Sequence, residues 1–178
     1  MRYRLDLLER HGLTLSAIHD VIGGLEPLPG AAAFLAELRA RTQVVILSDT
    51  FEQFAAPLMA QLGWPTILCH RLVVDGDRIV DYRLRMPDPK RQAVRALHGL
   101  NYRVLAAGDS YNDTTMLLEA DEGVLFHAPD NRPVTKELAR LYIEKNDPRR
   151  ALPKLQVLLK ADPRDLDGLV RELGRVPF

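Results

Sequence analysis

The spacing of apolar and polar positions changes along the chain and separates short covered strands from helices. Continuous apolar runs occur at Gln43–Leu47 ("QVVIL"), Tyr102–Ala107 and Gly123–Phe126. Such runs are typical of strands that are covered on both faces. Helical patterns follow the first two runs, over Phe51–Leu62 and as far as Ala120. Strands that alternate with helices predict an α/β fold with a Rossmann-like parallel sheet.

The remaining segments frame this predicted core. The first thirty residues indicate two short helices, and 31–41 is helical by propensity. Two extended runs around Asp75-Gly76-Asp77 predict a hairpin, and Asp88-Pro89 predicts the start of a helix. From Pro133 onward the pattern is helical and charged. We therefore divide the chain into three segments, namely 1–28, an α/β core over 29–132, and a helical segment over 133–178.

The composition argues against several classes of partner. Lysine plus arginine and aspartate plus glutamate stand at 24 each, so no global field favours nucleic acid or an anionic membrane. No apolar run approaches the roughly 20 residues that span a bilayer, and the N-terminus carries charges where a signal peptide is apolar. The single cysteine, Cys69, lies in an apolar stretch and indicates a buried thiol. We therefore expect a cytoplasmic protein, and its oligomeric state stays open.

Polar side chains gather where the predicted strands end. Ser48-Asp49-Thr50 follows the first run, Asp109-Ser110 follows the second, and Lys90 falls in the first turn of a helix. A lysine there opposes the helix dipole unless an anion is bound. Carboxylates at a strand end suit Mg²⁺, which takes oxygen ligands and bridges to phosphate. Taken singly, these residues can equally be turn formers, a helix cap and a solvated lysine.

Three motifs in this order carry a family resemblance. "VVILSDT", "DPKRQAV" and "AAGDSYNDTTML" resemble the haloacid dehalogenase superfamily, and most closely its phosphoserine phosphatase branch with the bifunctional phosphoserine phosphatase/homoserine phosphotransferases. The resemblance runs from about Met1 to Pro129. It implies a haloacid dehalogenase-like core with a small helical cap, of which 1–28 would be the remnant. It also implies Mg²⁺-dependent phosphoryl transfer from a small phosphorylated amino acid.

The resemblance assigns a role to each matching position. Ser48 and Lys90 would bind the transferring phosphoryl group, and Asp109 would ligate Mg²⁺ while Asp113 orients the metal shell. The substrate would be contacted by Arg4, through its carboxylate, and by Ser48, Asp49, Thr50 and Asn112. Taken alone, Arg4 can equally be a surface helix residue. Water and homoserine stay open as phosphoryl acceptors, because both would approach the same phosphoenzyme.

One family element has no counterpart in this sequence. Enzymes of the family begin with a strand that ends in DxD or DxE, whose first aspartate is the nucleophile. The hairpin pair Asp75 and Asp77 and the "DLDGLV" segment at Asp165 imitate that motif, but a two-strand turn and a terminal amphipathic helix are the better interpretations. In the resembling fold the missing strand lies at the centre of the sheet. Its neighbours should either pair directly or present unpaired edges.

These expectations favour two hypotheses and disfavour a third. The sequence is either that of a phosphoserine phosphatase or phosphotransferase that lacks its N-terminal nucleophile segment, or that of a non-catalytic protein that kept the phosphate and metal pocket. In both cases we expect no useful phosphatase activity from these 178 residues. A two-component receiver domain is disfavoured, because its lysine should follow the acidic cluster, whereas Lys90 precedes Asp109.

Overall fold

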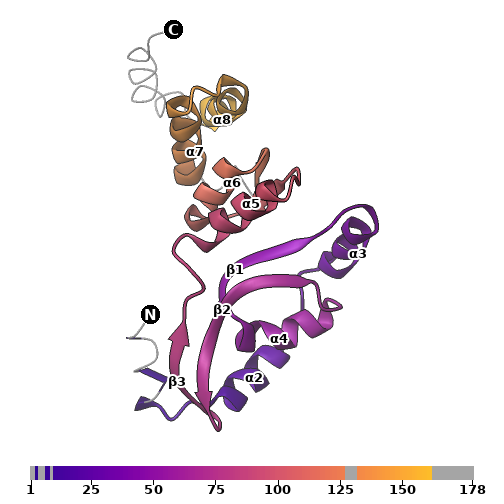
Figure 1. Ribbon diagram of the computed structural model, residues 1–178, viewed down its shortest axis with the longest axis vertical. Coiled ribbons are helices and arrows are strands. Elements are labelled where there is room, and N and C mark those ends of the chain that lie inside the picture. The colour runs from indigo at the N-terminus through magenta and orange to yellow at the C-terminus, as the bar shows by residue number, and fades with distance from the viewer. Residues whose placement is uncertain (1–2, 4–6, 9, 127–131, 162–178) are drawn as a thin grey trace. The chain divides into compact units, whose positions relative to one another are not determined.

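The structure is a computed structural model that describes residues 3, 7–8, 10–126 and 132–161. The chain forms two compact units, Met1–Pro89 and Lys90–Phe178. Figure 1 shows the elements of both units along the chain. Within the described residues, no helix combines the length and apolar character that crossing a membrane requires.

The first unit is built on a three-stranded sheet. Strand β1 (Val45–Phe51) pairs in parallel with β2 (Thr66–Asp75), which pairs antiparallel with β3 (Arg78–Arg83). Helix α4 (Glu52–Gln61) packs on β1 and β2 and against α2 (Leu15–Gly23), and α3 (Ala31–Arg41) precedes the sheet (Figure 1). The buried side chains of this unit include Phe51, Ala55, Met59, Cys69 and Leu72.

The hairpin predicted around Asp75-Gly76-Asp77 is confirmed. Asp75 pairs with Arg78, and Gly76 occupies the turn with a φ of 58°, in the left-handed region that glycine adopts most easily. The Asp77 carboxylate accepts hydrogen bonds from the backbone N–H of Ser16, at 2.9 Å, and from the Ser16 hydroxyl, at 2.5 Å. These bonds hold the pKa of Asp77 below its usual range. Asp77 therefore ties the hairpin to the start of α2.

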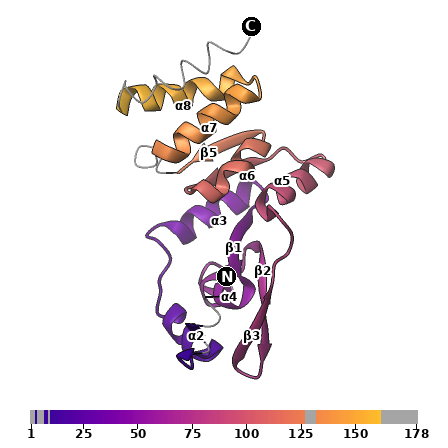
Figure 2. The same cartoon turned by 90° about the vertical axis from the view of Figure 1, so that its left-hand side faces the viewer.

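The second unit combines a two-stranded parallel sheet with helices. Strands β4 (Leu105–Gly108) and β5 (Glu122–Leu125) pair in register from Leu105 with Glu122 to Gly108 with Leu125. Helix α6 (Thr114–Glu119) connects them after a short 3₁₀ turn, η1 (Tyr111–Asp113). Helix α5 (Pro89–Gly99) precedes β4, and α7 (Arg132–Glu144) and α8 (Pro148–Ala161) follow β5 (Figure 2). Leu117, Leu138 and Tyr142 are among its buried side chains.

The predicted α/β class with parallel strand pairs is confirmed. Among the described strands, β1 pairs only with β2, and β4 pairs only with β5. Each of these pairs lies within one unit, so whether the two strands that carry the motifs pair directly or present unpaired edges stays a prediction. The boundaries 1–28, 29–132 and 133–178 stay predictions.

Candidate active site

The centre of the candidate site is an ion pair between Lys90 and Asp113. Asp88 and Pro89 begin α5 as predicted, which places Lys90 in its first turn. The Lys90 Nζ donates to Asp113 Oδ1 at 2.7 Å, and the two side chains are only 11% and 8% exposed. A buried charge requires a partner of opposite sign, so the two residues stabilise each other across 23 positions of sequence. The lysine at this unfavourable helix position therefore has an anion beside it, and that anion is Asp113.

The second oxygen of Asp113 is held by the chain just before it. Its Oδ2 accepts hydrogen bonds from the backbone N–H groups of Asp109 and Ser110, both at 3.1 Å, and from the Ser110 hydroxyl at 3.0 Å. Burial alone would raise the pKa of Asp113, but the hydrogen bonds from Lys90 and Ser110 and the charge of Lys90 outweigh it and lower that pKa. The carboxylate is therefore kept ionised in one orientation.

Gly108 makes this arrangement possible. A Cβ at position 108 would lie 2.5 Å from the Cβ of Asp113 and 2.7 Å from its Oδ2. No real side chain tolerates such contacts, so any other residue at this position would displace the Asp113 carboxylate. The glycine that ends β4 is needed here for space.

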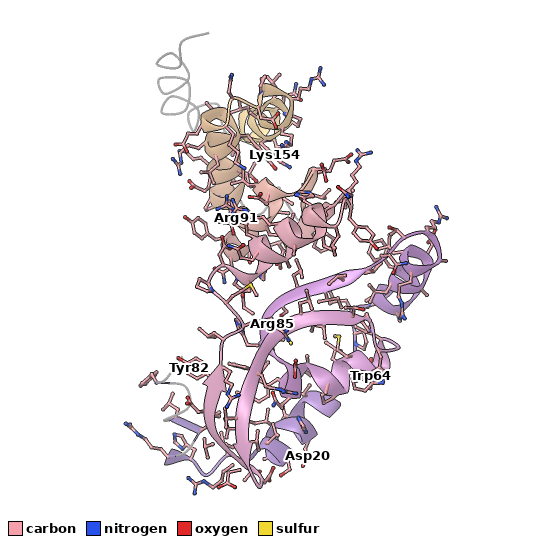
Figure 3. All side chains as sticks on the ribbon, viewed as in Figure 1. Asp20, Trp64, Tyr82, Arg85, Arg91 and Lys154 are labelled. Atoms are coloured by element: carbon pink, nitrogen blue, oxygen red, sulfur yellow. The ribbon has the colours of Figure 1, made fainter. Side chains whose placement is uncertain are left out.

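Helix α5 is tied to α6 at a second point. Arg91, labelled in Figure 3, donates to Glu119 Oε2 at 2.7 Å, and Arg95 Nε lies 3.2 Å from Glu119 Oε1. The hydrogen bond from Arg91 lowers the pKa of Glu119 most, and burial opposes it. Because Glu119 ends α6 and Asp113 directly precedes it, α5 is attached near both ends of this short helix.

We call Lys90 together with residues 108–113 the Asp113 pocket, and Asp109 and Asn112 are among its exposed members. Both side chains are exposed, whereas the Asp113 side chain between Lys90 and Ser110 is not. Among the described residues, no three histidine, cysteine or acidic side chains cluster as a metal site. Mg²⁺ commonly binds through one or two carboxylates, waters and a substrate phosphate. The exposed Asp109 carboxylate suits a direct ligand of the ion. The Asp113 oxygens already accept hydrogen bonds from Lys90, Asp109 and Ser110, so Asp113 suits a residue that orients the ligand.

Ser48, Asp49 and Thr50 belong to the first unit. The predicted strand over 43–47 extends further than expected, because β1 continues to Phe51. Its pairing with β2 shifts register between Leu47 and Phe51, so the three polar residues occupy the irregular stretch. The half-buried Ser48 hydroxyl accepts a hydrogen bond from the backbone N–H of Thr50 at 3.2 Å. This is the turn-forming role that a serine after a strand commonly has.

One predicted site residue and one segment rejected as a nucleophile motif lie outside the described residues, and one contributor to the site was missed. Arg4 and the Asp165 segment are not among the described residues. Ser110, which the sequence placed at the strand end without a role, forms a capping box with Asp113. The spacing Ser110-x-x-Asp113 is the usual sequence signal of that motif and could have found it.

With this geometry in place, comparison with known proteins gives the family. The model of the haloacid dehalogenase-like hydrolases matches residues 4–121. The chain belongs to this family. The matched range contains the Ser48 segment, Lys90 and the whole 108–113 pocket, and α7 and α8 lie beyond it.

Two curated relatives carry the same name. A phosphoserine phosphatase of Pseudomonas syringae pv. tomato is 63% identical over 132 residues, which are 74% of this chain and 56% of the relative. The phosphoserine phosphatase ThrH of Pseudomonas aeruginosa is 61% identical over 132 residues, 74% of this chain and 64% of the relative. The chain therefore spans less than two thirds of the length of these relatives.

Solved structures agree on the fold. A phosphoserine phosphatase described as a phospho-aspartyl intermediate analogue superposes with a TM-score of 0.56 at 21% identity, over 64% of this chain and 58% of that one. A phosphoserine phosphatase from T. onnurineus gives a TM-score of 0.52 at 26% identity, over 66% and 58% of the two chains. The α/β fold of this family is thus present.

Proposed function

We propose that this chain forms the phosphate-binding and Mg²⁺-binding part of a phosphoserine phosphatase, with homoserine as an alternative phosphoryl acceptor. The observation that carries the proposal is the Lys90–Asp113 pair, buried and held on the backbone of Asp109 and Ser110. Two relatives above 60% identity that are named phosphoserine phosphatase support the substrate class. The phosphate donor would be a small phosphorylated amino acid.

Each residue of the pocket has a part in this proposal. Asp109 would contribute a carboxylate to Mg²⁺, which when bound would supply positive charge to the phosphoryl oxygens. Asp113 keeps Lys90 and the Asp109 backbone in fixed positions, so the ammonium is placed before the substrate arrives. Asn112, exposed beside them, and Ser48 with Asp49 and Thr50 would contact the substrate. Arg4 would receive the substrate carboxylate through its planar guanidinium.

We further propose that these 178 residues alone do not hydrolyse phosphoserine. Asp75 and Asp77 resemble the family's nucleophile motif, but they lie in a hairpin turn, and the Asp77 carboxylate is engaged by Ser16. The first aspartate of that motif is the nucleophile and corresponds to Asp75, which lies at the end of β2 beside the hairpin turn and pairs with Arg78 of the antiparallel strand β3. The non-catalytic alternative, a phosphate-binding and metal-binding protein, is favoured by the same observation. The buried free thiol of Cys69 supports a reducing, cytoplasmic location.

The test is phosphate release from phosphoserine by the purified chain with and without MgCl₂. The proposal expects release no faster than in buffer, because Asp75 and Asp77, which resemble the nucleophile motif, lie at a hairpin turn. Mg²⁺-dependent release that Asp109→Asn abolishes would overturn the proposed inactivity while supporting the site. Release that Asp109→Asn leaves unchanged would point to a contaminating enzyme or to chemistry elsewhere in the chain.

A further inference from the structure

Helix α6 carries the candidate site at one end and contacts the C-terminal helices at the other. It has six residues, too few for a stable helix on its own, so its ends must be held by other groups. Asp113 directly precedes it, and the contacts of this residue with Lys90 and Ser110 hold its N-terminal side. The last carbonyl groups of any α-helix lack partners within the helix.

Side chains from α7, from α8 and from the turn between them donate to those carbonyl groups. The Tyr142 hydroxyl donates to the carbonyl oxygen of Leu117 at 3.1 Å, and Lys145 Nζ donates to that of Leu118 at 3.3 Å. Arg150 donates to the carbonyl oxygen of Ala120 at 2.6 Å. Two of these donors are cations, which the negative end of a helix dipole favours.

The Tyr142 contact is buried and closely fitted. Leu117 is 0% exposed and Tyr142 is 1% exposed, so water does not compete for this hydrogen bond. A Cβ at Gly123 would lie 2.5 Å from the carbonyl oxygen of Leu117 and 3.0 Å from the Tyr142 hydroxyl oxygen. The glycine in β5 therefore leaves the space in which the two groups meet. Arg150 stacks on the Tyr142 ring, with its guanidinium carbon 5.2 Å from the ring centroid.

The helix pair itself has the pattern of a repeat module. Helices α7 and α8 lie side by side, joined by a short turn (Figures 1 and 2). Tetratricopeptide repeats are pairs of helices with a characteristic sequence pattern. The first helix carries Leu, then a small residue, then Tyr three positions after the small residue. The second helix carries Ala and, four positions after that Ala, a large apolar residue. The corresponding residues here are Leu138, Ala139, Tyr142, Ala151 and Leu155, of which the first four are at most 2% exposed and Leu155 is partly buried. Such a module buries its apolar face against a neighbouring helix.

We propose that α7 and α8 form a tetratricopeptide-type helix pair that takes α6 as its neighbour, and that Tyr142 and Arg150 are positioning residues for the Asp113 pocket. By fixing the C-terminal carbonyl groups of α6 they fix the helix that begins beside Asp113. The family model matches residues 4–121, so Tyr142 and Arg150 lie beyond the matched range. The effect on phosphate binding rests on the proposed function, whereas the effect on the pocket does not.

The test compares three variants with the parent chain. Tyr142→Phe removes only the hydroxyl, Arg150→Met removes the guanidinium, and Arg150→Lys restores a cationic donor. Arg149→Met changes an exposed neighbour of the same type and is the matched control. Amide hydrogen exchange, resolved by NMR, is measured at Asp109 and Ser110, whose N–H groups donate to Asp113. The amides of the β4–β5 ladder are the internal reference.

We expect exchange at Asp109 and Ser110 to rise about tenfold relative to the ladder in Tyr142→Phe and Arg150→Met, with partial recovery in Arg150→Lys. The affinity for inorganic phosphate with MgCl₂, measured by calorimetry, should fall about fivefold in the same variants. An equal rise at the pocket and the ladder, or no rise at either, would overturn the positioning role. If exchange responds while the parent chain binds no phosphate, the proposed function fails and the positioning role stands.

Discussion

The Asp113 pocket follows the apolar strand β4, and the Ser48 segment continues the apolar start of β1. Both carry acidic and hydroxyl side chains, yet they are held in different ways. Asp113 is buried, paired with Lys90 and bonded to two backbone N–H groups in its own unit. Ser48 is half-buried in an irregular stretch of β1, where its hydroxyl accepts from Thr50. The difference teaches that the Asp113 carboxylate is fixed by contacts within the second unit that join distant positions, whereas the Ser48 hydroxyl is held by a contact with a residue two positions away.

The largest expected effect comes from breaking the buried ion pair. Lys90→Met leaves the Asp113 carboxylate buried without a cation, which should lower the free energy of unfolding by about 3 kcal/mol. Ser48→Ala removes one local hydrogen bond and should cost less than about 1 kcal/mol. Urea denaturation followed by circular dichroism measures both changes. The exposed Lys136→Met serves as the control for loss of a lysine, and equal losses at positions 90, 48 and 136 would contradict the comparison.

A smaller effect is expected from crowding the pocket without changing its charges. Gly108→Ala places a Cβ 2.5 Å from that of Asp113 and should cost about 2 kcal/mol through the forced displacement. At Gly99, the last residue of α5, a Cβ would meet nothing within 4 Å, so Gly99→Ala should be neutral or slightly stabilising. Thermal unfolding of the two variants distinguishes the outcomes. A similar melting temperature for both would show that the Gly108 contact is relieved without cost.

The first unit has its own hydrogen-bonding device, and disrupting it sharpens the comparison. The Gln53 side chain both accepts from the backbone N–H of Leu72, at 2.9 Å, and donates to its carbonyl oxygen, at 3.0 Å. The last residue of β2 that pairs with β1 is His70. Beyond it, the Gln53 side chain satisfies the backbone groups of Leu72 in place of a strand. Gln53→Ala should cost about 1.5 kcal/mol, because Leu72 is buried.

The matched control for this variant is Gln61→Ala, since Gln61 donates to the carbonyl oxygen of Leu25 in an exposed position. It should change the free energy of unfolding by less than about 0.5 kcal/mol. Urea denaturation of the two variants, side by side, measures the difference. If Gln61→Ala costs as much as Gln53→Ala, burial of Leu72 is not the cause.

The smallest effect is a pH dependence at the second tie between α5 and α6. Hydrogen bonding to Arg91 is the largest cause that holds the pKa of Glu119 below 4.5, its unfolded value. The folded state therefore gains stability from Glu119 above that pH and loses it as pH falls through the lower folded pKa. When the free energy of unfolding is measured against pH, the acid limb should fall less steeply in Glu119→Gln than in the parent chain, and the difference should be less than about 1 kcal/mol. An unchanged limb for Glu119→Gln would refute the tie.

Local signals predicted much of the fold. Helix α3 spans 31–41 as its composition predicts, Asp88-Pro89 begins α5, and Asp75-Gly76-Asp77 forms the hairpin turn. These features depend on residues close together in sequence. The extension of β1 through Ser48 to Phe51 depends on its partner β2, and the register shift there has no signal in the apolar run itself.

The candidate site was predicted as a set of residues but not as a set of contacts. The position of Lys90 in the first turn of a helix, and of Asp109 and Asp113 after an apolar run, indicated a phosphate and metal site. That Lys90 bonds directly to Asp113 follows from packing of α5 beside α6, which joins positions 23 apart. The sequence does not indicate the role of Gly108 either, because that role is to leave room for the Asp113 side chain in the folded turn.

The most direct test of the Asp113 pocket as a phosphate and Mg²⁺ site is an NMR titration of the isotope-labelled chain with inorganic phosphate and MgCl₂. We predict saturable shifts of the amide signals of Lys90, Asp109 and Ser110 that require both additions and disappear in Asp109→Asn. Shifts that are absent, or that persist in Asp109→Asn, would contradict the assignment of this pocket.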